Sequence, residues 1–305
     1  MPRKIRPAGI AALLSALGSL ISVISLAAAG QDAWELELLK ERARKDAEFK
    51  ASATSPMAGR ERLILNGRDR PFHVIREGRV ADAATSGSVP EIVLVFREGE
   101  WFWSGRSGAA CLRDGSAVAM KSEPLRPGDL FTAGRLTLAA YPGPDALALI
   151  VFDPERPQAR EFDKLLYFPP DRNYVVQAKL ERFAEAKPLQ VVTTRNLEKT
   201  FYRYGKLSFR IAGRDLELTA LKSSLEGPNA RYLFVPFKDD TNGRETYEVG
   251  RFLDLEEPEG DGIVVDFNRC YNPLCNYSPA YNCPLPPLEN FLETEIKAGE
   301  KTYPH

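Results

Sequence analysis

The stretch KLSFRIAGRDLELTAL, residues 206–221, decides the fold class of this sequence. Its first half alternates apolar and polar side chains, with Leu207, Phe209 and Ile211 on one face and Ser208 and Arg210 on the other. After a glycine at position 213 the alternation resumes, with apolar residues at 216, 218 and 220. A period of two is typical of a strand that buries one face. The stretch therefore predicts two antiparallel strands joined by a tight glycine turn.

Further short apolar runs lie on both sides of this hairpin. They are Glu91–Phe96, Glu100–Trp103, Arg135–Tyr141, Leu147–Phe152, Tyr174–Phe183, Tyr232–Phe237 and Gly262–Phe267. Turn residues separate the runs, and we see no crossover helices between them. This pattern predicts a mostly β fold, an antiparallel sandwich or barrel. A turn-rich break at 153–157 suggests two β subdomains, residues 60–153 and 160–305, although one shared core remains an alternative.

The N-terminus predicts export. Arg3, Lys4 and Arg6 precede an uncharged, hydrophobic run that ends in the small residues 27–29, the layout of a secretory signal peptide over residues 1–29. The alternative is an uncleaved anchor, which would be the only link to a membrane. We therefore expect a periplasmic or otherwise extracytoplasmic protein. Residues 32–55, beginning with the potential cap Asp32, predict one helix that ends before Pro56.

Composition excludes several functional classes. The 305 residues carry 41 Lys and Arg against 42 Asp and Glu, a net charge of −1, so no nucleic-acid partner is expected. The two histidines, His73 and His305, make a His-rich metal site or a His-based triad improbable. A calcium loop starting at Lys238 fails because its twelfth position is Val249 instead of glutamate. No phosphate-binding glycine loop is present, and we expect neither a cofactor nor a metal.

The cysteines carry a separate prediction. In an oxidising compartment, Cys275 and Cys283 are expected to form a disulfide, worth about 2.5 kcal/mol in the chain-entropy model. Cys270 could compete for either partner, and buried free thiols are the alternative. A zinc site has little support because the cysteines form no C-x-x-C pair and no histidine lies nearby.

The most unusual segment is Asp266–Pro287, DFNRCYNPLCNYSPAYNCPLPP. It concentrates asparagine, tyrosine, proline and cysteine after an apolar strand. Proline and asparagine favour an irregular but well-defined loop. Such a loop could present amides, phenols and a guanidinium to an unknown small polar ligand or a protein partner. Alternatively, its polar side chains satisfy the loop's own backbone and its tyrosines cover the core.

The same segment, with Gly250–Leu253, Glu289–Asn290 and Ala298–Lys301, resembles the C-terminal signature of an uncharacterised family, domain of unknown function 1684. The resemblance runs from about Phe162 to the C-terminus. Before it, Leu125–Asp129 is weakly similar to a forkhead-associated sandwich, without that domain's phosphopeptide-reading residues. The family implies no activity, but the resemblance directs attention to particular residues. The candidate ligand-binding residues are Arg251, Asp266, Asn268, Arg269, Tyr271, Asn272 and Asn290.

Two functions fit these residues. The first is a binding or scaffold β-domain, in which the two arginines pair with an anionic or carbonyl group and the amides orient it. The second is an extracytoplasmic hydrolase that uses Asp266 with Arg251 or Arg269, or with a second carboxylate. Against both stands a structural alternative, in which Asp266 and Arg269 form a buried pair that holds the loop in place.

Overall fold

The computed structural model describes residues 32–69, 72–76, 79–82, 91–105 and 109–304. The predicted signal peptide lies outside these residues. The chain divides into two compact units, residues 1–44 and residues 45–305. Within the described ranges, no helix is both long enough and apolar enough to span a membrane.

The predicted N-terminal helix is present as α2 (Ala33–Ala51). Asp32 begins it, because its carboxylate accepts a hydrogen bond from the backbone N–H of Trp34 at 3.2 Å. A short 3-10 turn, η1 (Pro56–Ala58), follows, and Ser55 caps that turn through the N–H of Met57. Near the end of the helix, Phe49 packs edge-on against Tyr277, with ring centroids 5.0 Å apart.

The next part of the chain is a two-sheet sandwich, as the strand pattern predicted. The six-stranded sheet has the order β1 (Gly59–Asn66), β10 (Ala146–Phe152), β9 (Leu136–Pro142), β8 (Asp129–Ala133), β6 (Cys111–Arg113) and β7 (Ser116–Ala117). The four-stranded sheet has the order β3 (Arg79–Asp82), β2 (Phe72–Arg76), β4 (Ile92–Arg97) and β5 (Glu100–Gly105). All of these pairs are antiparallel. Trp101 and Trp103 are buried with Phe131 and Leu149 in a single core that both sheets line.

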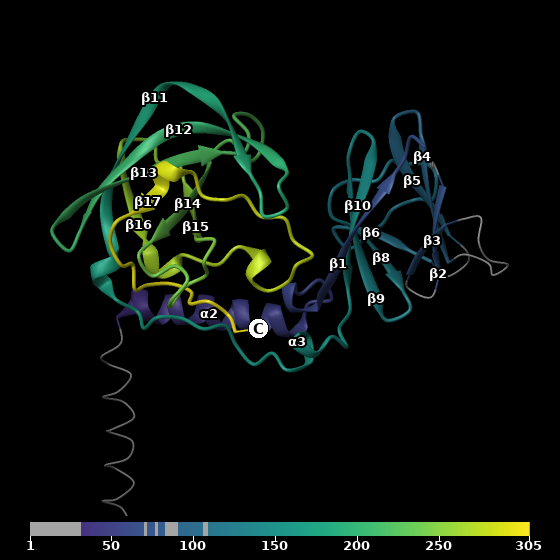
Figure 1. The fold of residues 1–305 in the computed structure, drawn as a ribbon, viewed down its shortest axis with the longest axis horizontal. Coiled ribbons are helices and arrows are strands. Elements are labelled where there is room, and N and C mark those ends of the chain that lie inside the picture. The colour runs from purple at the N-terminus through teal and green to yellow at the C-terminus, as the bar shows by residue number, and fades with distance from the viewer. Residues whose placement is uncertain (1–31, 70–71, 77–78, 83–90, 106–108, 305) are drawn as a thin grey trace, which may run out of the picture. The chain divides into compact units, whose positions relative to one another are not determined.

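Beyond a short helix, α3 (Pro157–Arg160), and a 3-10 turn, η2 (Arg172–Tyr174), a third sheet curls into a nearly closed barrel (Figure 1). Its order is β15 (Arg251–Glu256), β14 (Tyr232–Asp239), β13 (Arg214–Lys222), β12 (Glu198–Ile211), β11 (Val175–Val192) and β16 (Gly262–Asp266). The hairpin predicted at 206–221 is confirmed, since Leu207 pairs with Leu218 and Phe209 with Leu216.

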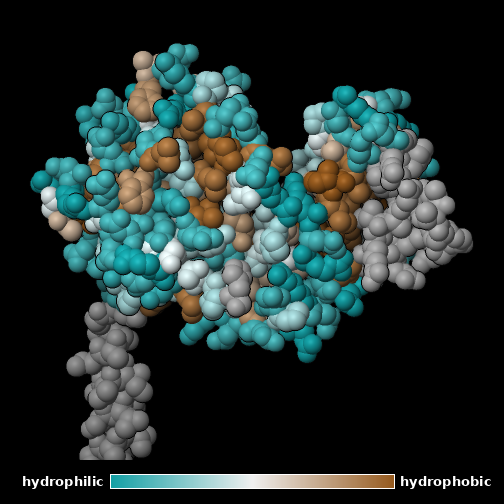
Figure 2. Space-filling model, viewed as in Figure 1, coloured by the Kyte–Doolittle hydropathy of each residue, from teal (hydrophilic) through white to brown (hydrophobic). Residues whose placement is uncertain are grey.

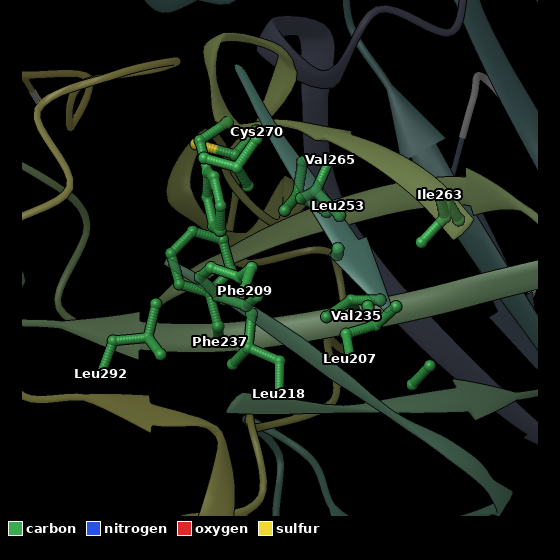
Figure 3. Packing of buried hydrophobic residues seen from close by; sticks show 14 of the residues in the cluster. Leu207, Phe209, Leu218, Val235, Phe237, Leu253, Ile263, Val265, Cys270 and Leu292 are labelled. Carbon is green, nitrogen blue, oxygen red and sulfur yellow. The ribbon is translucent and has the colours of Figure 1, made fainter. Parts of the chain in front are cut away.

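Apolar side chains from these strands fill the barrel. Figure 3 shows Leu207, Phe209 and Leu218 meeting Val235 and Phe237 in a continuous core. The alternation read from the sequence therefore places one face of each strand inside the barrel. The mostly β, antiparallel prediction is confirmed at both the sandwich and the barrel.

Strands β11 and β12 are much longer than their neighbours and bend. The pairing register of β11 with β12 shifts between Arg182 and Lys187. At the bend, a Cβ on Gly205 would lie 2.8 Å from the carbonyl oxygen of Glu181. The backbones of β11 and β12 are therefore too close here for a residue with a side chain, which explains the glycine. Beyond the bend, Val191 and Phe201 leave the barrel core and join a second apolar cluster with Phe234 and Phe252.

After β16 the chain has little regular structure. It runs through three short 3-10 turns, η3 (Phe267–Arg269), η4 (Leu274–Asn276) and η5 (Leu288–Asn290), to a short strand, β17 (Phe291–Leu292), that pairs with β14 in parallel. This C-terminal segment, residues 267–304, is yellow-green to yellow in Figure 1. Four of its asparagines, at positions 268, 272, 276 and 290, are buried. Buried amides need hydrogen-bond partners, so the segment is held by specific contacts.

Candidate functional site

Arg251 lies at the start of β15 and is completely buried. One of its terminal nitrogens donates to Asp239 at 2.7 Å and to the carbonyl of Ile296 at 2.7 Å. The other donates to the carbonyls of Ala298 and Glu300. Asp239 is equally buried and also accepts hydrogen bonds from Thr241. This predicted ligand-binding arginine therefore ties the C-terminal segment to the barrel.

Asp266, Asn268 and Arg269 lie together at η3. The Asp266 carboxylate caps the turn through the N–H of Asn268 at 3.0 Å, accepts from the side-chain amide of Asn268 at 2.9 Å, and pairs with Arg269. Asn268 also exchanges hydrogen bonds with both backbone groups of Asp171. These three residues are engaged with one another, and none of them contacts Arg251 through a hydrogen bond or ion pair that the structure records.

Asn272 and Asn290 bind backbone as well. The side chain of Asn272 donates to the carbonyl of Lys301 at 2.7 Å. The backbone N–H of Asn272 donates to the buried carboxylate of Glu300, also at 2.7 Å. Asn290 accepts from the N–H of Thr219 and donates to the carbonyls of Thr219 and Pro236. Because β13 and β14 share only one paired position, Leu221 with Phe234, the Asn290 side chain bridges them where the ladder is interrupted.

Tyr271 differs from the other six candidates because it lines a cavity. The cavity has a volume of ≈ 410 Å³, which suits a small molecule. One wall comes from the bent sheet and contains the rings of Phe201, Phe234 and Phe252. Another wall comes from the C-terminal segment, and its residues are Tyr271, Pro273, Leu274, Tyr281, Asn282, Cys283 and Pro284. Figure 2 shows apolar surface over the barrel sheet, near the position of β13 and β14 in Figure 1.

The aromatic rings of the cavity form an ordered array. Phe201 stacks on Phe234 with centroids 5.4 Å apart, and Phe234 meets Phe252 edge-on at 4.8 Å. Phe252 in turn meets Tyr271 edge-on at 5.9 Å. Strand β14 explains part of this array, because it sends Leu233 and Val235 into the barrel and Phe234 to the cavity. Offset and edge-on ring contacts of this kind stabilise one another and limit side-chain motion.

Two phenols at the cavity share one carboxylate. Tyr271 donates to Asp254 at 2.9 Å, and Tyr232 donates to the same carboxylate. Burial, reinforced by the negative charge of Asp254, raises the pKa of both phenols, so they remain protonated hydrogen-bond donors at neutral pH. The Asp254 oxygens are thus occupied by protein groups.

The other polar groups of the cavity can serve as donors. Lys199 is exposed, with its ammonium 5.1 Å from the centroid of Phe201, and it takes part in none of the ion pairs recorded for the described residues. The amide oxygen of Asn282 accepts from the N–H of Arg195 at 3.2 Å, which leaves its NH₂ as the available end. Ser223 adds an exposed hydroxyl. An apolar interior with cationic and neutral donors suits a ligand with an apolar body and an acidic group.

All four cysteines are free thiols in the structure, so the predicted Cys275–Cys283 disulfide is not formed there. The two residues are nevertheless neighbours, since the N–H of Cys275 donates to the sulfur of Cys283 at 3.3 Å. The cross-link stays a prediction. Among the described residues, no three His, Cys, Asp or Glu side chains gather into a group that could hold a metal ion.

Sequence reasoning missed the phenylalanines of the cavity. Only Phe234 lies in a run predicted as a strand, and none of Phe201, Phe234 and Phe252 was named as a site residue. A signal was available at Tyr232–Phe237, where apolar residues occupy consecutive positions instead of alternating. A strand that is apolar on both faces is covered on both faces. The second face of β14 is the one that meets the C-terminal segment and the cavity.

Fold and cavity together define a curled antiparallel β-domain with an aromatic pocket beneath its C-terminal segment. A family model described as "Protein of unknown function (DUF1684)" matches residues 160–301. An uncharacterized protein of Haloarcula marismortui, solved by solution NMR, is 38% identical to this chain, with a TM-score of 0.41, and the match covers 49% of this chain and 83% of that chain. No curated protein matches the sequence. The C-terminal half of this chain belongs to the DUF1684 family, which confirms the resemblance of its sequence motifs.

Proposed function

We propose that this chain is an exported binding protein whose barrel domain takes up a small ligand with a planar apolar body and an acidic group. The observation that carries the proposal is the ≈ 410 Å³ cavity, which three phenylalanines of the sheet line together with residues of the C-terminal segment. The rings supply apolar contact area, and the stacked geometry favours a flat ligand. Lys199, Asn282 and Ser223 supply the donors for its acidic group.

The rigidity of the C-terminal segment supports binding. Arg251, Asn268, Asn272 and Asn290 each hold this segment through hydrogen bonds from a buried side chain to backbone. A wall that is already ordered loses little conformational entropy when a ligand binds, which favours affinity. In this proposal the polar residues of the segment position the pocket, and the aromatic residues contact the ligand. The hydrolase receives no such support, since Asp266 and Arg251 are engaged with separate partners.

Titration with anilinonaphthalene sulfonate, a planar aromatic anion whose fluorescence rises in apolar surroundings, tests the proposal. We expect saturable binding by the folded protein. Ser223→Trp should abolish it, because the exposed Ser223 lines the cavity and an indole there would fill it without removing a core contact. Ser116→Trp, at an exposed position of the sandwich, is the matched control and should bind as the parent does. Equal binding by both variants would refute the pocket as the site.

The acidic group is tested separately. Lys199→Glu should weaken binding of the same dye about two- to fivefold, the size of an exposed ion pair. Lys187→Glu makes the same charge change at an exposed position of β11 that does not line the cavity, and should leave the affinity unchanged. An equal loss in both variants would show that overall charge, and not Lys199, attracts the anion.

A further inference from the structure

Cys275 and Cys283 form a pair of thiols in the wall of the cavity. Cys283 lines the cavity directly and is 6% exposed, while Cys275 is half-buried beside it. Besides the hydrogen bond from its own N–H to Cys283, Cys275 receives one from the hydroxyl of Tyr247, with 3.7 Å between oxygen and sulfur. Both cysteines belong to the apolar cluster that contains Phe201, Phe234 and Phe252.

The other two cysteines lie elsewhere. Cys270 is buried within the barrel core, as Figure 3 shows, and its thiol donates to the carbonyl of Ala298 at 3.4 Å. Burial raises the pKa of Cys270 to about 11, which keeps it an unreactive thiol. Cys111 is buried in the core of the sandwich. The structure therefore places Cys270 and Cys111 apart from the pair. From the sequence, Cys270 could still have been the partner of Cys275 or Cys283.

The two cysteines of the pair are held differently. Cys283 is anchored to the loop between β11 and β12, because its N–H donates to the hydroxyl of Thr194 at 3.1 Å and its carbonyl accepts from the N–H of Thr194 at 2.9 Å. Cys275 lies in the short turn η4. Hydrogen bonding from Cys283, together with that from Tyr247, lowers the pKa of Cys275 against the opposing effect of burial. Hydrogen bonding between the two thiols, followed by burial, raises the pKa of Cys283, while the hydrogen bond from the backbone N–H of Cys275 acts in the opposite direction.

We infer that Cys275 and Cys283 are a redox-active dithiol, oxidised by an external disulfide such as oxidised glutathione, and that their cross-linking tightens ligand binding in the adjacent cavity. The thiolate of Cys275 attacks one sulfur of the external disulfide, forms a mixed disulfide and releases one thiolate. Cys283 then loses its proton and displaces the second thiol from Cys275. The protein is oxidised by two electrons, and the external disulfide leaves as two thiols.

The coupling to binding rests on the proposed function of the cavity. Tyr281 and Asn282 lie between Cys275 and Cys283 in the chain, and both line the same wall as Cys283. A bond between the two sulfurs would close a ring that contains part of this wall. The cross-link would add a covalent restraint to a wall that hydrogen bonds already order. The wall would then have still fewer conformations to lose on binding, so the oxidised protein should bind more tightly than the reduced protein.

The first measurement is chemical. The full chain, reduced with dithiothreitol and then treated with oxidised glutathione, should lose two hydrogens by intact mass, and non-reducing peptide mapping should join Cys275 to Cys283. Cys275→Ser and Cys283→Ser should instead remain mixed disulfides with glutathione or free thiols. Cys111→Ala, a cysteine remote from the cavity, should form the cross-link normally. Free thiols at 275 and 283 after treatment, or a bond to Cys270, would overturn the assignment.

The second measurement compares the Kd of anilinonaphthalene sulfonate for the oxidised and reduced forms of the same preparation. We expect a several-fold lower Kd for the oxidised form, and no difference in Cys275→Ser. Equal Kd values with a mapped cross-link would overturn the coupling. Absence of dye binding in both forms would refute the proposed function, while the peptide map would still decide the fate of the dithiol.

Discussion

At the scale of single residues, the buried amides of the C-terminal segment act as substitutes for regular secondary structure. Asn290 spans Thr219 and Pro236 where strand pairing is interrupted, and Asn268 binds both backbone groups of Asp171. An asparagine side chain carries the same donor and acceptor as a peptide group, so it can replace a missing ladder bond. The side chains of Asn268, Asn272 and Asn290 thus satisfy backbone groups that would otherwise lack partners, which helps to explain how this asparagine-rich segment can be buried.

Asp239→Asn should be strongly destabilising. Asp239 and Arg251 have fully buried side chains, and no other carboxylate forms an ion pair with Arg251 among the described residues. Removing the negative charge would leave a buried guanidinium without compensation, which costs about 3–5 kcal/mol. Urea denaturation measures the change in the free energy of unfolding. Asp240→Asn, at the exposed neighbouring position, is the control, and an equal effect of the two substitutions would contradict the buried-pair argument.

At the scale of secondary structure, one carboxylate joins several strands of the barrel. Glu257 follows β15 and binds Arg182 of β11 at 2.9 Å, Tyr204 of β12, and Lys222 of β13 at 2.5 Å. Lys222 in turn lies over the ring of Tyr204, 3.7 Å from its centroid. Burial, the largest influence, pushes the pKa of Glu257 upward, but the hydrogen bonds from Lys222, Tyr204 and Arg182 outweigh it and lower the pKa to about 2.

This lowered pKa predicts a loss of stability in acid. The ionised form of Glu257 is favoured in the folded state, so its contribution is fully present above the ordinary carboxyl pKa of 4.5 and disappears as the pH falls from 4.5 toward 2. Urea midpoints measured across this window should fall more steeply for the parent protein than for Glu257→Gln. Glu256→Gln, whose side chain is 80% exposed, should follow the parent curve. Parallel curves for all three proteins would contradict a stabilising role for the Glu257 charge.

At the scale of the whole molecule, the proposed export determines the length of the mature chain and the redox conditions that the cysteines meet. The basic start, the apolar run and the small residues 27–29 are the basis of this proposal. An oxidising compartment would favour the cross-linked form of Cys275 and Cys283. Export would thus supply the conditions in which the dithiol is oxidised. The N-terminus of the mature chain tests export, and peptide mapping tests the cross-link.

Mass spectrometry of the protein recovered from the exported fraction of its cells tests the cleavage. The mature chain should begin near Gly30 or Gln31, because a signal peptidase cuts after the small residues that end the apolar run. A chain that retains Met1 and stays with the membrane would show that the segment is an uncleaved anchor. Recovery of the full-length chain in the cytoplasm would reject export.

The sequence by itself determined the antiparallel β class, the N-terminal helix, the hairpin at 206–221 and the family of the C-terminal half. These features depend on local periodicity and on motifs that are contiguous in the chain, which is why they can be read without coordinates. The partners of the polar residues could not be read in this way. Arg251 meets the carbonyl of Ile296, and Asn290 meets Thr219, across chain separations that no local pattern encodes.

Only the tertiary structure showed which residues share the cavity. Phe201 and Phe234 come from two strands and look like ordinary core residues in their own stretches of sequence, whereas Tyr271, a candidate ligand-binding residue, comes from the C-terminal segment. The bend of β11 and β12 and the course of the C-terminal segment bring them to one place. The same folding buries most of the polar residues that composition had made conspicuous, because an irregular segment needs internal hydrogen bonds before it can form one wall of a pocket.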